Sequence, residues 1–185
     1  MTNNIKLQEV CKQLHIPVVG TTSWPLPIEA REILQESNPC PFTAADIDER
    51  LIGTTDFMPH SAIVCLFPYH VPHEGPTNLS RYTWATDYHL VVTDYLQRLV
   101  DEFKTTAPNA SFSIHCDTSP LADRYMAYLA GLGFYGKNKC FINPTWGSYI
   151  VIGTVLTTLE FESNTPMADT CMGCNQCITS CLGQC

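Results

Sequence analysis

The chain has 185 residues and a formal net charge of −8. Hydrophobic residues make up 45% of it and charged residues 15%, which is typical of a folded domain rather than a disordered chain. The negative charge disfavours a general nucleic-acid-binding protein, because contacts with phosphates need clustered Lys and Arg. The chain has neither an apolar stretch long enough to cross a membrane nor a signal-peptide pattern. We therefore expect a cytoplasmic protein that does not enter a membrane and keeps its ten cysteines reduced.

The spacing of apolar residues predicts an alternation of helices and strands. A helix over 44–52 is expected to start at Thr43, whose hydroxyl group can accept hydrogen bonds from the first helical amides. The continuously apolar run from Ser61 to Phe67 predicts a strand buried on both faces. In chain order, the expected helices are 4–14, 27–36, 44–52, 86–103 and 119–132, and the expected strands are 16–20, 61–67, 111–116, 138–142 and 148–158.

This order of elements predicts an α/β fold with a central sheet flanked by helices. We expect one domain over residues 1–160, followed by a short segment, 161–185, that carries a group of cysteines. The chain is long enough to bury a core of its own.

Four cysteines in that segment, Cys171, Cys174, Cys177 and Cys181, have the spacing C-x2-C-x2-C-x3-C. Bacterial ferredoxins use this spacing to hold a [4Fe–4S] cluster. Zinc sites usually use two separated C-x2-C pairs, and disulfide frameworks are typical of small secreted chains. The spacing therefore predicts an iron–sulfur cluster and a role in electron transfer, with zinc or disulfides as alternatives.

Asp117 follows a predicted strand and precedes a predicted helix, which is a common position for catalytic groups in α/β proteins. The residues after it, Thr118, Ser119 and Pro120, are also typical of a helix start. From the residues alone, an ordinary helix cap or turn aspartate is the more common role for such a residue.

Three glycines, Gly131, Gly133 and Gly136, come shortly before Lys137. They allow the backbone to approach a ligand closely, with Lys137 placed to meet an amide or phosphate oxygen. Isolated glycines more often end a helix or form a tight turn, and this alternative stays open. They are not a dinucleotide-binding motif, because they follow a helix rather than open one.

Several sequence blocks, in one order along nearly the whole chain, resemble the epoxyqueuosine reductase family. The order ends in the ferredoxin-type cysteine run, and it also includes the strand that begins at Ser61. The blocks are R-Y-x-W-A-T-D-Y-H (81–89), D-T-S-P-L-A-D-R (117–124), A-G-L-G-F-Y-G-K-N (130–138), I-N-P-x-x-G-S (142–148) and I-G-T-V-L-T (152–157).

The resemblance implies a nitroreductase-like α/β domain that holds cobalamin, joined to the start of a ferredoxin-like module. It implies reduction of the epoxide of epoxyqueuosine in tRNA to queuosine. We expect an external electron donor such as flavodoxin or ferredoxin, and a monomeric protein. Asp117 matches the proposed proton donor of the family, which needs a carboxylic acid that keeps its proton. The expected cobalamin contacts are Arg81, Tyr82, Asp87, Tyr88, His89, Gly133, Gly136, Lys137, Asn138 and Ser148.

The chain departs from the family pattern in its last residues. It has one cysteine run where family members carry two, so the fourth cluster ligand is expected to be Cys181 or Cys185. Leu182 stands where the family has proline after the fourth cysteine, and the family's C-terminal tRNA-contacting region is not found. The expected function is therefore a reductase of the epoxyqueuosine type, truncated or a short paralogue. The alternatives are a non-catalytic corrinoid- or cluster-binding protein and a domain with a zinc-stabilised tail.

Overall fold

The computed structural model describes residues 2–36, 46–53, 55–72, 75, 77–168, 171 and 173–183. The helices are α1 (Asn3–Gln13), α2 (Ile28–Glu36), α3 (Ile47–Ile52), the 3-10 turn η1 (Arg81–Trp84), α4 (Tyr88–Lys104), α5 (Asp123–Leu129) and α6 (Gln176–Thr179). The strands are β1 (Val18–Ser23), β2 (Ser61–Pro68), β3 (Phe112–Cys116), β4 (Phe134–Tyr135), β5 (Phe141–Ile142) and β6 (Ile150–Thr157).

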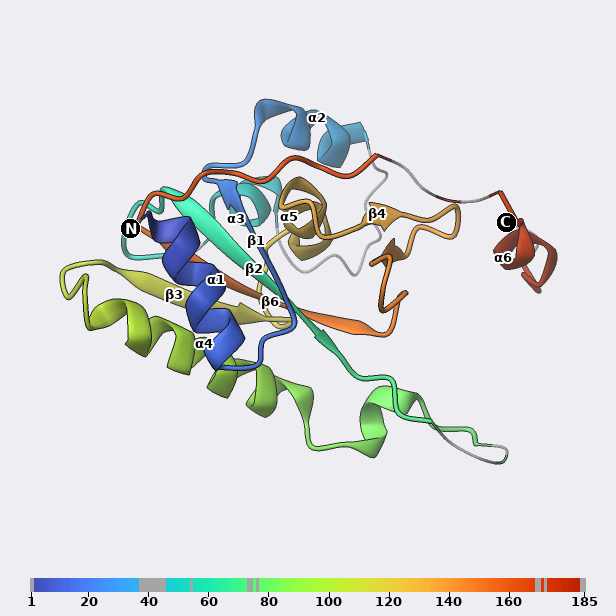
Figure 1. Ribbon diagram of the computed structural model, residues 1–185. Helices are drawn as coiled ribbons and strands as arrows, with labels where there is room; N and C mark the ends of the chain where they lie inside the picture. The colour runs from blue at the N-terminus through green and yellow to red at the C-terminus, as the bar shows by residue number, and fades with distance from the viewer. Residues whose placement is uncertain are drawn as a thin grey trace.

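A four-stranded sheet in the order β1-β2-β6-β3 forms the centre of the molecule, and all of its pairs are antiparallel. Helices α1 and α4 cover one face, and α5 packs on the other face, with α2 and α3 on that side (Figure 1). A separate two-stranded hairpin, β4-β5, follows α5. The expected α/β fold with a central sheet between helices is confirmed.

Strand β2 is buried on both faces, as its apolar sequence predicted. Ile63 and Cys65 pack with α1 and α4, whereas Val64 and Leu66 pack with α5. This alternation follows from the two-residue period of a strand. Continuous apolar runs are typical of parallel sheets because helices cover both of their faces. Here an antiparallel sheet has helices on both faces, so the same sequence pattern arises.

Aspartate side chains set the starts of two helices. The Asp46 carboxylate accepts from the Glu49 amide at 2.8 Å and caps α3, which begins at Ile47. Residue 43, the expected cap, lies outside the described residues. Asp87 caps α4 by accepting from the His89 amide at 2.9 Å.

Two expected elements are shorter in the structure than in the sequence analysis. The helix expected over 119–132 is α5, which begins at Asp123, so that the residues from Asp117 to Ala122 form a loop. The strand expected over 138–142 is reduced to β5, and its partner β4 was not predicted. Two-residue strands are too short to show a period of hydrophobicity.

After β6 the chain returns along β1 and α1 (Figure 1). Asn3 and Asn4 donate to the carbonyl oxygens of Glu160 and Glu162, each at 2.9 Å. The Asn164 side chain accepts from the Thr21 amide at 2.7 Å. These bonds attach the segment before the cysteines to the main domain. Within the described residues, none of the helices combines the length and apolarity needed to cross a bilayer.

The packing of α4 on the sheet provides a test of the core. Leu96 is 0% exposed, whereas Leu90 on the same helix is 68% exposed. We expect Leu96→Ala to lower the free energy of unfolding by about 2–5 kcal/mol, because it removes buried apolar surface and leaves a cavity. The matched control Leu90→Ala should change it by less than about 0.5 kcal/mol. Urea denaturation of both variants measures the difference, and equal effects would contradict the packing described here.

Candidate functional site

A pocket of about 1590 Å³ opens on the face of the sheet that carries α5. It is larger than the roughly 300–1,000 Å³ of ordinary small-molecule sites. Its walls come from α2, α3, η1, the start of α4, the loop before α5, α5 itself, the loop after β4 and the first residues of β6. Six of the lining residues are tyrosines: Tyr69, Tyr82, Tyr88, Tyr125, Tyr128 and Tyr135. Such a surface offers flat apolar rings with polar hydroxyl groups to a large ligand.

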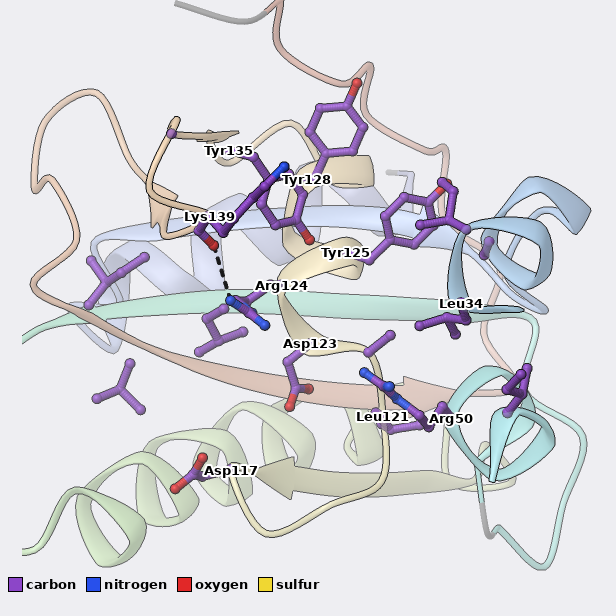
Figure 2. Close-up of a pocket in the computed structure, with 18 of the residues that line it drawn as sticks. Leu34, Arg50, Asp117, Leu121, Asp123, Arg124, Tyr125, Tyr128, Tyr135 and Lys139 are labelled. Carbon is purple, nitrogen blue, oxygen red and sulfur yellow. Dashed lines mark hydrogen bonds between the residues drawn. The ribbon is translucent and has the colours of Figure 1, made fainter. Parts of the chain in front are cut away.

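Cations are concentrated in this pocket. Five of the ten Lys and Arg residues of this acidic chain line it: Arg31, Arg50, Arg124, Lys137 and Lys139. Arg31 forms an ion pair with Asp48. Arg124 donates to the carbonyl oxygen of Lys139 at 3.1 Å and thereby ties α5 to the loop after β4 (Figure 2). The α5 side of the pocket can therefore receive a ligand that carries negative charge.

Asp117 lies in the wall of the pocket, directly after β3. Its backbone has a φ of 57°, an uncommon conformation for a residue other than glycine. The Tyr88 hydroxyl group donates to Asp117 Oδ2 at 2.5 Å. This hydrogen bond raises the pKa of Tyr88 above its usual value, since loss of its proton would place two negative charges together. Asp117 does not cap α5, which starts at Asp123, so the alternative role as a cap is not supported.

His89 lies between two carboxylates. Its Nδ1 is 2.8 Å from Asp87 Oδ1, and its Nε2 is 3.4 Å from Asp117 Oδ2. The hydrogen bonds from the ring and amide of His89 lower the pKa of Asp87. A neutral imidazole has one N–H and can donate to only one of these carboxylates. The ring hydrogen bond of His89 goes to Asp87, and Asp117 lies at ion-pair distance from the other ring nitrogen.

Asp123, at the first position of α5, also lies in the pocket wall, and Asp46 and Asp48 are the other lining aspartates besides Asp117 (Figure 2). Burial raises its pKa to about 7, and the charge of Asp117 acts in the same direction. Thr154 Oγ1 on β6 donates to its Oδ1 at 3.4 Å, which opposes the shift only partly. Asp123 is not among the residues expected from the sequence, because its burial arises from the packing of α5 on β6, for which the local sequence contains no signal.

Five of the eleven residues expected to bind or act in the domain line the pocket: Tyr82, Tyr88, Asp117, Gly136 and Lys137. His89 contacts Asp117 in the pocket wall, and Asp87 contacts His89. Four others do not line it. Arg81 lies over the rings of Trp84 and Tyr149, Asn138 accepts from the Cys140 amide, Gly133 faces the carbonyl of Ile142, and Ser148 is in an exposed turn.

The glycine block is explained by packing. Gly131 has a φ of 69° and ends α5, in agreement with the alternative role of a helix stop. A Cβ atom on Gly133 would lie 2.3 Å from the carbonyl oxygen of Ile142, so any larger residue would separate β4 from β5. These two glycines therefore shape the loop that carries Lys137 and Lys139.

The four cysteines of the tail lie in a loop and in α6, and their side chains are exposed or half-buried. No three His, Cys, Asp or Glu side chains among the described residues are already arranged to hold a metal ion. Residue 185, the other candidate ligand, lies outside that part of the chain. The Lys137 ammonium group donates to Asn175 Oδ1 at 2.6 Å, so the loop between Cys174 and Cys177 contacts the pocket wall.

Comparison with known proteins agrees with these features. The family model "Epoxyqueuosine reductase QueG, DUF1730" matches residues 57–118. An epoxyqueuosine reductase of Gloeobacter violaceus is 36% identical over 110 residues, which are 60% of this chain and 34% of the relative. One from Bacillus cereus is 39% identical over 101 residues, 55% of this chain and 27% of the relative. The chain is related to the epoxyqueuosine reductases. It spans about a third or less of the length of these two curated relatives.

Solved epoxyqueuosine reductases share the fold over nearly the whole chain. The Streptococcus thermophilus structure matches with a TM-score of 0.82 and 25% identity, covering 98% of this chain and 52% of that one. A second structure, solved with an epoxyqueuosine-modified tRNA stem loop, has a TM-score of 0.82 and 26% identity, covering 96% and 51%. A Bacillus subtilis structure, whose aspartate catalytic loop is swung out of the active site, has a TM-score of 0.79 and 25% identity, covering 96% and 51%. The expected resemblance to epoxyqueuosine reductases is confirmed.

Asp123 makes the stability of the fold depend on pH. Its pKa is 3.8 in an ordinary environment and about 7 in the folded chain, so the folded state binds the proton more tightly than the unfolded state. The contribution of this group to stability therefore falls as pH rises from about 4 to about 7. We expect Asp123→Asn, which cannot ionise, to remove this fall and to be more stable than the wild type at about pH 8, by about 4 kcal/mol. Urea denaturation over this pH range measures the difference, and parallel pH profiles for the two proteins would contradict the assignment.

Proposed function

We propose that this protein acts as a reductase of the epoxyqueuosine type, which converts the epoxide of epoxyqueuosine in tRNA to the alkene of queuosine. The observation that carries the proposal is the position of Asp117 in the wall of a large, tyrosine-lined pocket, in a chain related to the epoxyqueuosine reductases. One relative was solved with an epoxyqueuosine-modified tRNA stem loop, which supports tRNA as the substrate. A cytoplasmic location, where tRNA and reduced thiols occur together, agrees with this role.

Cobalamin is the proposed cofactor of the pocket, whose volume and lining fit it. Tyr82 and Tyr88 offer aromatic surface to a flat macrocycle, and Lys137 and Lys139 offer positive charge to the amide and phosphate oxygens of its side groups. When bound, the cobalamin supplies the low-potential electrons that the removal of an epoxide oxygen requires.

The residues of the chain supply the proton chemistry. Asp117 donates a proton to the epoxide oxygen as negative charge develops on it. Tyr88 holds Asp117 Oδ2 in place through its hydroxyl group, and His89 contacts the same oxygen. The stacking of Tyr88 on His89, with ring centroids 4.1 Å apart, keeps both groups at the start of α4. The pocket therefore holds an acid and two groups that orient it.

A [4Fe–4S] cluster on Cys171, Cys174, Cys177 and Cys181 is the proposed entry point for electrons, with Cys185 as the alternative fourth ligand. Four thiols at this spacing are the right donor set for the cluster. The bond from Lys137 to Asn175 places the cysteine loop against the pocket wall, which favours electron transfer between them. Flavodoxin or ferredoxin is the proposed external donor to the monomeric protein.

Replacement of Asp117 tests the proposed acid. Asp117→Asn keeps the shape of the side chain but removes its proton, so we expect queuosine formation to fall at least about 100-fold while cobalamin binding is retained. The control Asp94→Asn changes an exposed aspartate on α4 and should keep the wild-type rate. The measurement is queuosine formation from epoxyqueuosine-containing tRNA under anaerobic conditions. A wild-type rate in Asp117→Asn would eliminate the catalytic role.

The same assay separates catalysis from binding. A wild-type protein that takes up cobalamin and iron, but forms no queuosine in vitro or in a reductase-deficient strain, would favour the non-catalytic alternative.

Metal analysis tests the cluster. Anaerobically purified protein should be brown and contain about four iron atoms per chain. Cys174→Ser should lose most of this iron, because the cluster loses a thiolate ligand. Cys140→Ser removes another exposed thiol outside the cysteine run and should keep the iron. Stoichiometric zinc in place of iron would favour a structural tail, and a colourless, metal-free protein would contradict both.

A further inference from the structure

Asp123 is one of four aspartates that line the pocket, with Asp46, Asp48 and Asp117, and the reaction described above does not use it. It is half-buried at the start of α5 and contacts Thr154 on β6. Among the described residues, no Lys, Arg or His lies within ion-pair distance of this carboxyl group. A buried carboxylate without a cationic partner is costly, so the group keeps a proton instead.

The charged groups around Asp123 act in opposite directions. Asp117, on the loop before α5, favours the protonated form, whereas Arg50 on α3 favours the ionised form. The amides at the start of α5 also favour the ionised form. Arg124, the next residue, is directed to the carbonyl oxygen of Lys139. Burial outweighs the groups that favour ionisation and raises the pKa of Asp123 to about 7.

The proposed reaction consumes more protons than Asp117 carries. Reduction of an epoxide to an alkene breaks two C–O bonds, forms the second bond of a C=C pair, and releases the oxygen as water. It takes up two protons and two electrons, and the flavodoxin or ferredoxin proposed above supplies the electrons one at a time. Asp117 donates one proton and must then be reprotonated before it can act again.

We propose that Asp123 is the proton reserve of this pocket, a positioning group that holds a proton at neutral pH and returns it to Asp117. Both carboxyl groups line the same cavity, and they lie close enough for the charge of Asp117 to raise the pKa of Asp123. The two carboxyl groups differ in exposure, which suits them to different roles. The side chain of Asp117 is 60% exposed and faces the ligand space, whereas Asp123 is screened by α5 and β6. This inference rests on the proposed epoxide reduction.

A simpler role for Asp123 is that of an acidic residue in the first turn of a helix, where a negative charge is favourable. That role requires an ionised side chain, so the protonation state decides between the two. Infrared difference spectra of the carboxyl C=O band, assigned by its loss in Asp123→Asn, measure this state without any cofactor. A titration midpoint near pH 7 supports the reserve, and a midpoint near the ordinary value of about 4 overturns it.

The pH dependence of turnover tests the role itself. We expect the wild-type rate of queuosine formation to fall as pH rises above about 7, because Asp123 loses its proton. Asp123→Asn should lower the rate at neutral pH about 10-fold and remove the decrease above about pH 7. Asp123→Glu keeps a carboxyl group, so it should restore most of the rate and the decrease with pH. The control Asp94→Asn should behave as the wild type.

The outcomes separate this inference from the proposed function. If the wild type forms queuosine and Asp123→Asn keeps both its rate and its pH profile, Asp123 is not the reserve but the reductase function stands. If Asp123→Glu fails to restore the rate that Asp123→Asn loses, the effect comes from packing and the inference is wrong. A wild type that binds cobalamin and iron but forms no queuosine overturns the proposed function, and the role of Asp123 with it.

Discussion

The antiparallel pairing of β2 with β6 over eight residues is the constraint on which the core and the site both depend. It places two apolar strands in the middle of the sheet, where helices cover them on both faces. Strand β6 also brings Ile150 and Ile152 to the pocket and Thr154 to Asp123. Because its other edge pairs with β3, the same strand sets the position at which Asp117 leaves the sheet.

The close approach of α4 to this sheet is a second consequence of β6. Gly153 pairs with Cys65 and Cys116, and a Cβ atom on it would lie 2.6 Å from Val92 of α4. The absence of a side chain there lets α4 pack directly on the strand. The start of α4 then carries Tyr88 to Asp117, although 29 residues separate them in the chain. Gly153, in the middle of the sheet, thus helps to bring Tyr88 and Asp117 together at the edge of the sheet.

Two of the four aspartates that line the pocket, Asp117 and Asp123, experience different environments. Asp117 is exposed and accepts a hydrogen bond from Tyr88, whereas Asp123 is half-buried against β6. Differences of this kind let two chemically identical side chains take different protonation states at one pH, which is how acid–base sites divide their roles. The cations of the pocket lie mainly toward the loop after β4, where Lys137 also contacts the cysteine loop.

The sequence by itself determined the elements with a clear period and the residues with a distinctive spacing. The apolar run at Ser61, the long helix α4, the cysteine spacing and the block that begins at Asp117 all lie in local patterns, which is why they could be read directly. Only the tertiary structure decided that the sheet is antiparallel, that β4 pairs with β5, and that Gly133 serves packing. It also decided that Asp123 is half-buried in the pocket that Asp117 lines. These features depend on contacts between distant segments, and the burial that changes the behaviour of a carboxyl group is created by its neighbours in space rather than by its neighbours in the chain.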